Sequence, residues 1–331
     1  RCRAGIRHIL TESHSEGHCY LPKEELIIRA VDLLQVELEI IESQLRLAVE
    51  EQEFSSYDDA IYIPWIMDQE DRVAVRLATL VKTEPKVFKQ LSDKQFQSLV
   101  PDFALSDEQL QAIDAAMASK VSIITGGPGV GKTTVLSTLV SLYEEQGRIV
   151  TLCSPTGKAA RRMEEATGHS ASTIHKLLKY RGGGFEHDEN EPVQGDVFIL
   201  DECSMIDISL FNAFLSALPL EAVLVMVGDV DQLPSVGPGC VLLDLISSNE
   251  IPVTRLKEIF RQEKSSDIVT SAHAVNKGSW FPSNVGQDFF FIPSKKSENL
   301  QSTLRRLLLE RIPQKFDFNP ILDVQILAPM Y

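Results

Sequence analysis

The stretch of sequence that most constrains the fold is residues 126–134, Gly-Gly-Pro-Gly-Val-Gly-Lys-Thr-Thr. It matches the phosphate-binding pattern G-x-x-x-x-G-K-[ST] without a mismatch. The apolar run at 121–124 before it is typical of a buried parallel strand. Residues 134–146 after it predict a helix with one apolar stripe, ending near Gly147. The loop therefore joins a strand to a helix start.

Such a junction gathers backbone N–H groups and the positive end of a helix around one anion. We expect Lys132 to reach the β and γ phosphates of a nucleotide and the Thr133 hydroxyl to hold Mg²⁺. The residues predicted to bind ATP are Gly127, Pro128, Gly129, Val130, Gly131, Lys132, Thr133 and Thr134. The alternative is a glycine-rich turn that binds nothing.

Two acids follow the second buried run, Val197 to Leu200, and form a Walker B arrangement. Asp201 is expected to hold Mg²⁺, and Glu202 to orient and polarise the attacking water for hydrolysis of the γ-phosphate. The alternative is that these acids only cap the start of a helix.

A third buried run, 224–227, leads into Gly-Asp-Val-Asp-Gln-Leu-Pro-Ser-Val-Gly at 228–237. Gln232 is expected to contact the γ-phosphate, and the stiff turn after it to transmit that contact toward bound nucleic acid. Arg261 further on is placed to stabilise charge on the transferring phosphate, although by itself it is an ordinary surface arginine.

Upstream of the phosphate loop, residues 105–117 predict a helix that Ser106 and Gln109 open with a capping box. Capping is one interpretation of Gln109. The other is that its amide recognises the adenine edge, and one side chain can do both.

Basic residues gather in one part of an otherwise acidic chain. The segment 154–162 follows a strand predicted at 149–153 and carries Pro155, Thr156 and Lys158. Because this cluster starts at a loop beside the nucleotide site, we favour nucleic-acid binding over a solvated helix face. Thr173 and His175 could contact a phosphodiester backbone, and helix capping explains the threonine equally well. The members of the basic cluster are Lys158, Arg161, Arg162, Lys176, Lys179 and Arg181.

The bulk composition limits the remaining possibilities. The chain has 331 residues, which suits two or three domains, and a net charge of −15, so any nucleic-acid surface must be a local basic patch. No run approaches the length of a membrane span. We expect a cytoplasmic protein because the scattered cysteines suit a reducing compartment. Its five scattered cysteines are expected to be reduced thiols. The absence of an initiator Met suggests a piece of a longer protein.

The first hundred residues carry no catalytic motif. Helices are predicted around 6–10, 26–34 and 36–47, followed by a hairpin over 53–64. Three helices and a hairpin resemble a winged helix, but we favour a structural spacer because the segment is rich in Glu and poor in Lys. A connecting helix is expected over 68–82, before a boundary marked by Pro85 and Pro101.

The end of the chain predicts strand, helix and strand. After a helix over 265–276, the pattern indicates strands at 289–292 and 324–328 around a leucine-striped helix. The domains expected are 1–100, 101–278 with a surface hairpin or loop near 180–195, and 279–331.

In this order the motifs resemble the RecD-like DNA helicases of superfamily 1, the branch that moves 5′ to 3′. The segments that carry the resemblance are LSDEQ, GGPGVGKTT, SPTGKAA, STIHKLL, DECSM, VGDVDQLPSVGPG, LKEIFRQ and LAPM, within residues 105–331. The resemblance implies an α/β fold: a RecA-like P-loop domain with a parallel sheet, after a mainly helical, winged-helix-like domain. Residues 279–331 would be the truncated start of a second RecA-like domain.

The resemblance also implies site roles. Gln109 would contact adenine, and Gln232 and Arg261 would sense the γ-phosphate. Contacts to single-stranded DNA would come from Pro155, Thr156, Lys158, Thr173 and His175. The segment 180–195 lies where the family carries a strand-separating pin. ATP and Mg²⁺ are the implied cofactors, DNA repair the implied setting, and nuclease-complex subunits possible partners.

This sequence departs from the family after Tyr331, where the motifs of the second motor domain are absent. We therefore expect the parent protein to unwind DNA, and this piece to bind nucleotide weakly and hydrolyse it little. Two alternatives remain: a P-loop ATPase of another class, such as a clamp-loader-like remodeller, and a non-catalytic adaptor that binds nucleotide structurally.

Overall fold

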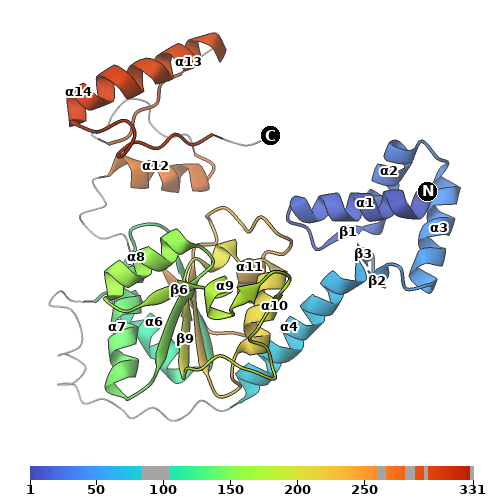
Figure 1. The fold of residues 1–331 in the computed structure, drawn as a ribbon, viewed down its shortest axis with the longest axis horizontal. Coiled ribbons are helices and arrows are strands. Elements are labelled where there is room, and N and C mark those ends of the chain that lie inside the picture. Colours follow the sequence, from blue (N-terminus) through green and yellow to red (C-terminus); the bar gives the residue numbers. More distant parts are fainter. Residues whose placement is uncertain (84–104, 259–265, 280–287, 294–296, 329–331) are drawn as a thin grey trace. The chain divides into compact units, whose positions relative to one another are not determined.

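The computed structural model describes residues 1–83, 105–258, 266–279, 288–293 and 297–328 (Figure 1). The chain divides into two compact units, Arg1–Lys264 and Ser265–Tyr331. The domain boundaries predicted near residues 100 and 278 stay predictions. Pro85 and Pro101, expected to mark the first boundary, lie outside the described residues.

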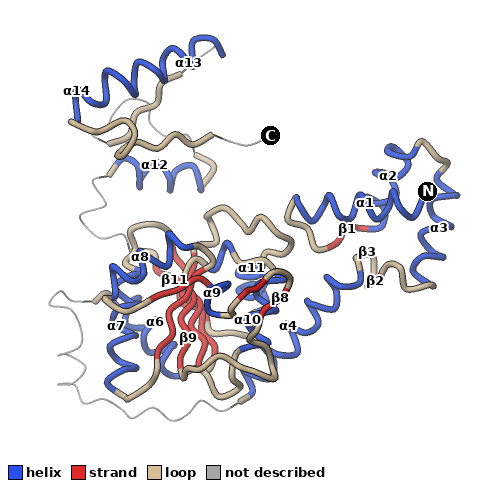
Figure 2. Tube along the Cα trace, viewed as in Figure 1, coloured by secondary structure: helices blue, strands red, loops and turns tan. Residues whose placement is uncertain are grey.

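A parallel sheet forms the centre of the first unit, as Figure 2 shows in red. Its described strands run in the order β11-β4-β10-β9-β5-β6, and every printed pairing between neighbours is parallel. The α/β fold predicted from the sequence is confirmed. The strands are β4 (Val121–Gly126), β5 (Val150–Ser154), β6 (Ala171–Thr173), β9 (Val197–Leu200), β10 (Val223–Gly228) and β11 (Val253–Leu256).

The central strands are apolar on both faces because helices cover both sides of the sheet. In β9, Phe198 and Leu200 enter one core cluster, while Val197 and Ile199 enter the other. Successive side chains of a strand point to opposite faces, so a run without polar residues supplies two cores at once. This explains why these strands read as continuous apolar runs.

The helices fall into two layers. One core contains residues of α6 (Asp107–Ala118), α7 (Lys132–Glu145) and α8 (Gly157–Thr167). The other contains residues of α9 (Ile174–Leu177), α10 (Ile208–Ala217) and α11 (Val241–Ser248). The helix predicted over 134–146 thus begins two residues earlier, at Lys132, directly behind the phosphate loop.

The N-terminal part of the first unit has a separate core. Its helices are α1 (Cys2–Ser15), α2 (Lys23–Leu34) and α3 (Leu38–Glu50), and its strands are β1 (Tyr20–Pro22), β2 (Ser55–Tyr57) and β3 (Ala60–Tyr62). The predicted hairpin is present as β2 and β3. Strand β1 was not predicted, and it pairs with β3 antiparallel across about forty residues of chain.

Helix α4 (Pro64–Lys82) joins this part to the sheet. It packs on α10, where the Arg76 guanidinium donates to the carbonyl oxygens of Leu215 at 3.2 Å and Leu218 at 2.7 Å. Carbonyls at a helix end lack the N–H donors of a following turn, so Arg76 supplies donors there, in addition to the Leu218 N–H that donates to the Leu215 carbonyl at 3.3 Å.

The described residues of the second unit contain helices and no strand. The helical elements are α12 (Asp267–Asn276), α13 (Ser297–Arg306), the π-helical turn η2 (Leu307–Arg311) and α14 (Ile312–Phe316). The strands predicted at 289–292 and 324–328 are therefore wrong: both segments are irregular. A strand needs a hydrogen-bonding partner, and no described segment of this unit pairs with either one.

Candidate nucleotide and nucleic-acid site

The phosphate loop lies between β4 and α7 with a backbone that favours glycine. Gly129 and Gly131 both have φ of +79°, in the left-handed region. At Gly126 an added Cβ would lie 2.6 Å from the Leu256 carbonyl oxygen, so no larger residue fits without movement. The loop leads into the first turn of α7, whose N–H groups have no partner within the helix and can therefore bind phosphate oxygens.

Lys132 extends over this loop. Its Nζ donates to the carbonyl oxygens of Gly126 and Gly127, the latter at 2.8 Å. The ammonium is thus held by the loop's own backbone, where it can exchange these carbonyls for the more strongly attractive oxygens of a phosphate. Thr133 follows in the first helical turn with an exposed side chain.

Asp201 and Glu202 follow β9, and the surroundings of Asp201 shift its pKa. Burial raises the pKa of Asp201 to about 6, opposed by the Glu202 backbone N–H that donates to its Oδ1 at 2.9 Å. The Glu202 charge raises this pKa further, and the Lys132 charge lowers it. The ammonium of Lys132 therefore lies close enough to Asp201 for the two charges to interact. A half-buried carboxylate beside a second one is a suitable donor set for a divalent cation.

Glu202 has an unusual backbone conformation. Its φ is +55°, and it caps the short 3₁₀ turn η1 (Cys203–Met205). A left-handed residue other than glycine costs roughly 1–2 kcal/mol, a strain often found where a side chain must be aimed at a substrate. The carboxylate of Glu202 thus leaves the sheet at the same edge as that of Asp201.

Gln232 lies in the loop after β10, and a neighbouring acid that we did not predict holds it. The Gln232 amide donates to Oδ2 of Asp229 at 3.2 Å, and Oδ1 of Asp229 accepts from the Asp231 N–H at 3.1 Å. Asp229 is buried, whereas Gln232 is exposed. The signal available in the sequence was that Asp229 comes directly after Gly228 at the end of an apolar strand run.

Sheet order brings these groups together. Lys132 follows β4, Gln232 follows β10, and Asp201 follows β9, and these are three neighbouring strands. Their registers align Gly228 of β10 with Thr125 of β4, and Met226 with Leu200 of β9. The carboxyl ends of parallel strands meet at one edge, which is where open α/β sheets bind ligands.

Gln109 is buried and serves the capping box predicted for it. Its Oε1 accepts from the Ser106 N–H at 3.0 Å, and Oγ of Ser106 accepts from the Gln109 N–H at 3.3 Å. Its Nε2 lies 3.5 Å from the carbonyl oxygen of Gly131 in the phosphate loop. The side chain therefore connects α6 to the loop, and adenine recognition stays a prediction.

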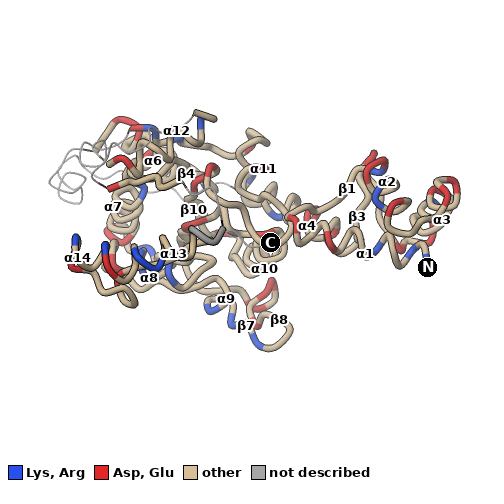
Figure 3. Tube along the Cα trace, turned by 90° about the horizontal axis from the view of Figure 1, so that it is seen from above, with Lys and Arg blue, Asp and Glu red and all other residues tan. Residues whose placement is uncertain are grey.

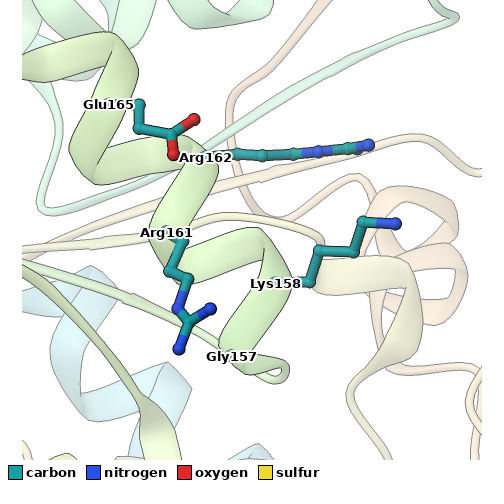
Figure 4. A pocket seen from close by; sticks show the side chains of 5 residues that line it. All are labelled: Gly157, Lys158, Arg161, Arg162 and Glu165. Atoms are coloured by element: carbon teal, nitrogen blue, oxygen red, sulfur yellow. The ribbon is translucent and has the colours of Figure 1, made fainter. Parts of the chain in front are cut away.

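The first group of predicted DNA contacts surrounds the start of α8. The Thr156 hydroxyl accepts from the Ala159 N–H at 3.3 Å and caps the helix, so this side chain has a structural task. Pro155 precedes it and Lys158 lies in the first turn. Figure 4 shows Lys158, Arg161 and Arg162 around a hollow that Gly157 and Glu165 also line.

The second group of predicted DNA contacts, Thr173 and His175, lies at the end of β6, the neighbour of β5 in the sheet. The Thr173 hydroxyl accepts from the Lys176 N–H at 3.1 Å and caps α9. The His175 ring packs 5.8 Å from those of Tyr180 and Phe185, which belong to the hairpin strands β7 (Tyr180–Arg181) and β8 (Gly184–Phe185). Figure 3 shows Lys and Arg along α8 and around α9 and β7.

One predicted catalytic residue cannot be placed. Arg261 lies outside the described residues, so its role as a γ-phosphate contact stays a prediction. Among the helices in the described ranges, none combines the length and apolar character needed to cross a membrane.

Comparisons with known proteins place the chain in a family. A family described as an AAA domain matches residues 104–281. The ATP-dependent RecD2 DNA helicase of Deinococcus radiodurans is 36% identical over 282 residues, which are 79% of this chain and 38% of that protein. The RecBCD enzyme subunit RecD of Mycolicibacterium smegmatis is 32% identical over 248 residues, covering 65% of this chain and 43% of the relative.

A solved structure of Bacteroides Pif1 bound to ssDNA aligns with a TM-score of 0.38 and 18% identity, over 63% of this chain and 57% of that one. The chain spans less than half the length of the two relatives above. The family match covers more than half of the 331 residues. The chain belongs to the AAA-domain family and is a RecD-like member of it, as the helicase motifs of its sequence indicated.

Proposed function

We propose that this chain is the ATP-hydrolysing part of an ATP-dependent DNA helicase that translocates on single-stranded DNA, 5′ to 3′ by its resemblance to RecD-like proteins. The observation that carries the proposal is the shared edge of β4, β10 and β9, where an ammonium, two acids and an amide follow three neighbouring strands. A relative of this chain is named an ATP-dependent DNA helicase.

Each group at this edge has a distinct task in phosphoryl transfer. Lys132 and the loop N–H groups would bind the β and γ phosphates, and Gln232 would contact the γ-phosphate. Glu202 would orient the attacking water and accept its proton. Thr133 and Asp201 would hold Mg²⁺, which when bound neutralises phosphate charge. The residues fit such an ion because burial raises the pKa of the half-buried Asp201 carboxyl, whose charged form is stabilised by a nearby cation.

DNA would bind along the basic α8 and α9 region. Lys158, Arg161 and Arg162 supply cations there, in a chain whose net charge is −15. Phosphate contacts of this kind bind single strands without sequence preference and weaken as salt rises. The hairpin of β7 and β8 next to His175 is the proposed strand-separating element.

The names of the relatives support a proposal for the whole protein's partners. Several are called RecBCD enzyme subunit RecD, so subunits of a nuclease complex are proposed partners of the parent protein. This chain alone is proposed to bind nucleotide and to hydrolyse it slowly, because arginines contributed by a second motor domain can change turnover by several powers of ten.

The test measures ATP turnover of this chain and of a longer form, with and without oligo-dT. Stimulation of the longer form by oligo-dT, with little turnover by this chain, is expected. In the longer form Glu202→Gln should abolish hydrolysis and leave nucleotide binding intact. Brisk DNA-stimulated hydrolysis by this chain would contradict the slow-turnover part of the proposal.

Two other functions predict different results. A clamp-loader-like remodeller would be stimulated by protein and indifferent to DNA. A nucleotide-binding adaptor would show the same low turnover with Glu202 or with Gln at that position.

A further inference from the structure

Two cysteines, Cys19 and Cys240, lie near the place where the N-terminal part of the first unit is hydrogen-bonded to the loop that carries Gln232. We call residues 229–240 the sensor loop. Near its end, the Gly239 N–H donates to the Gly17 carbonyl oxygen at 3.0 Å, so the turn between α1 and β1 is hydrogen-bonded to this loop. A Cβ added to Gly239 would lie 3.3 Å from Sγ of Cys19. Cys240 is the next residue, one Cα step of about 3.8 Å further on.

The Cys19 and Cys240 thiols differ in exposure, so an oxidant in solution can react with one of them before the other takes part. Cys240 is exposed, whereas Cys19 is only 7% exposed. Cys153 and Cys203 are fully buried in the sheet core, and Cys2 lies at the far end of α1, half-buried. Cys240 is therefore the thiol an oxidant reaches, and Cys19 is the thiol positioned behind it.

The surroundings of Cys19 supply a proton acceptor. The Glu70 carboxylate on α4 accepts a hydrogen bond from the Cys19 thiol. Its charge also raises the pKa of the Tyr62 hydroxyl. Burial, followed by this hydrogen bond and the charges of Glu70, Asp244 and Cys240, raises the pKa of Cys19 well above its usual range. Cys19 is therefore a protonated thiol at neutral pH and does not react first.

We propose that Cys19 and Cys240 form a reversible disulfide that ties the N-terminal part of the chain to the sensor loop. With hydrogen peroxide as oxidant, the Cys240 thiolate attacks one peroxide oxygen: an S–O bond forms, the O–O bond breaks, and hydroxide leaves as water after taking up a proton. Sγ of Cys19 then attacks Sγ of Cys240, and its proton passes through the Glu70 carboxylate to the hydroxide that leaves Cys240. The S–S bond forms, the S–O bond breaks, and a second water leaves.

The electrons balance, since two thiols lose two electrons and two protons while one peroxide becomes two waters. A disulfide joins Cα atoms that are usually 4.4–6.8 Å apart, and the Gly17–Gly239 hydrogen bond already holds the two segments close. Cys240 is exposed, so its side chain can turn toward Cys19 without leaving a packed core.

The consequence for turnover rests on the proposed function. The sensor loop begins at Asp229 and Gln232, which would contact the γ-phosphate, and ends at Cys240. A covalent link at its end would restrict the loop, so the oxidised chain should hydrolyse ATP more slowly. A thiol reductant should restore the rate.

The experiment treats the full 331-residue chain with hydrogen peroxide and digests it without reduction. Mass spectrometry should find peptides joined through Cys19 and Cys240, with the loss of two hydrogens. Cys240→Ser should abolish the link, and Cys19→Ala should leave a Cys240 sulfenic acid that dimedone traps. Cys2→Ser is the matched control and should keep the link.

Three results would overturn the proposal: no cross-linked peptide, a link from Cys240 to Cys2, or only links between chains. Because the link is read by mass, it is independent of hydrolysis. A disulfide that forms without slowing turnover would contradict the effect on hydrolysis alone, whereas a reduced longer form without turnover would contradict the proposed function instead.

Discussion

The amide of Gln232 donates a 3.2 Å hydrogen bond to Oδ2 of Asp229, so a buried carboxylate sets the direction of an exposed amide at the edge of the sheet. The Asp229 carbonyl oxygen also accepts from the Gln232 N–H at 3.2 Å. Asp229 therefore holds both the backbone N–H and the side-chain amide of Gln232. An amide held in this way loses less conformational entropy when it binds a phosphate than a mobile one does.

Asp229→Ala should therefore reduce the preference for ATP analogues over ADP. Losing one hydrogen bond of about 0.5–1.5 kcal/mol predicts a change of roughly two- to tenfold in the ratio of the two Kd values. Displacement of a fluorescent ADP measures both constants. Asp231→Ala, on an exposed neighbour in the same loop, is the control and should leave the ratio unchanged. Equal ratios for Asp229→Ala and wild type would show that the carboxylate does not position Gln232.

Lys158→Ala should weaken binding of single-stranded DNA several-fold. Removing one phosphate contact should also lower the slope of log affinity against log salt by about 0.7. Fluorescence anisotropy of labelled oligo-dT over a range of salt concentrations measures both quantities. Lys23→Ala removes an exposed lysine at the start of α2 and serves as the control. If both variants lose affinity equally, the α8 region is not a specific contact surface.

Gly237→Ala should destabilise the first unit. A Cβ at this position would lie 2.2 Å from Oδ2 of Asp207, whose Oδ1 accepts from the Leu210 N–H at 2.8 Å and caps α10. Relieving such an overlap costs about 1–3 kcal/mol of unfolding free energy, a Tm decrease of several degrees. A thermal melt followed by circular dichroism measures it. Gly157→Ala, where an added Cβ meets nothing within 4 Å, should leave the Tm nearly unchanged.

His14 should make the stability of the N-terminal part depend on pH. Burial lowers the pKa of His14 below its ordinary value, and its Nε2 has no hydrogen-bond partner among the described residues. The folded state therefore binds this proton less readily than the unfolded state, whose pKa is about 6.5. The stabilisation is present above that pH and is lost as pH falls through it, by at most about 1.4 kcal/mol per pH unit.

Urea unfolding between pH 7 and pH 5 tests this dependence. Trp65 is a local probe, since its ring lies edge-to-face with the His14 ring at 5.8 Å. His14→Gln should flatten the dependence on pH, and His8→Gln, on the exposed side of α1, should not. An unchanged slope in His14→Gln would assign the acid sensitivity to other groups.

Local sequence patterns were sufficient for the central strands and for the phosphate loop. The runs at 121–124, 197–200 and 224–227 became β4, β9 and β10, because strands covered on both faces favour apolar residues at most positions. Short peripheral strands were not predictable in this way. Strands β1, β6 and β11 were missed, and the runs at 289–292 and 324–328 were wrongly read as strands, since a short segment becomes a strand only through its partner.

By itself, therefore, the sequence determined which side chains follow each buried strand: Lys132, Asp201 with Glu202, and Gln232. Only the tertiary structure decided that β10 lies between β4 and β9, so that these groups meet at one edge and Lys132 acts on Asp201. It also revealed that Thr156 and Thr173 cap helices and that Asp229 holds Gln232. The physical reason is that strand order and side-chain partners depend on hydrogen bonds between residues distant in the chain, which local patterns do not encode.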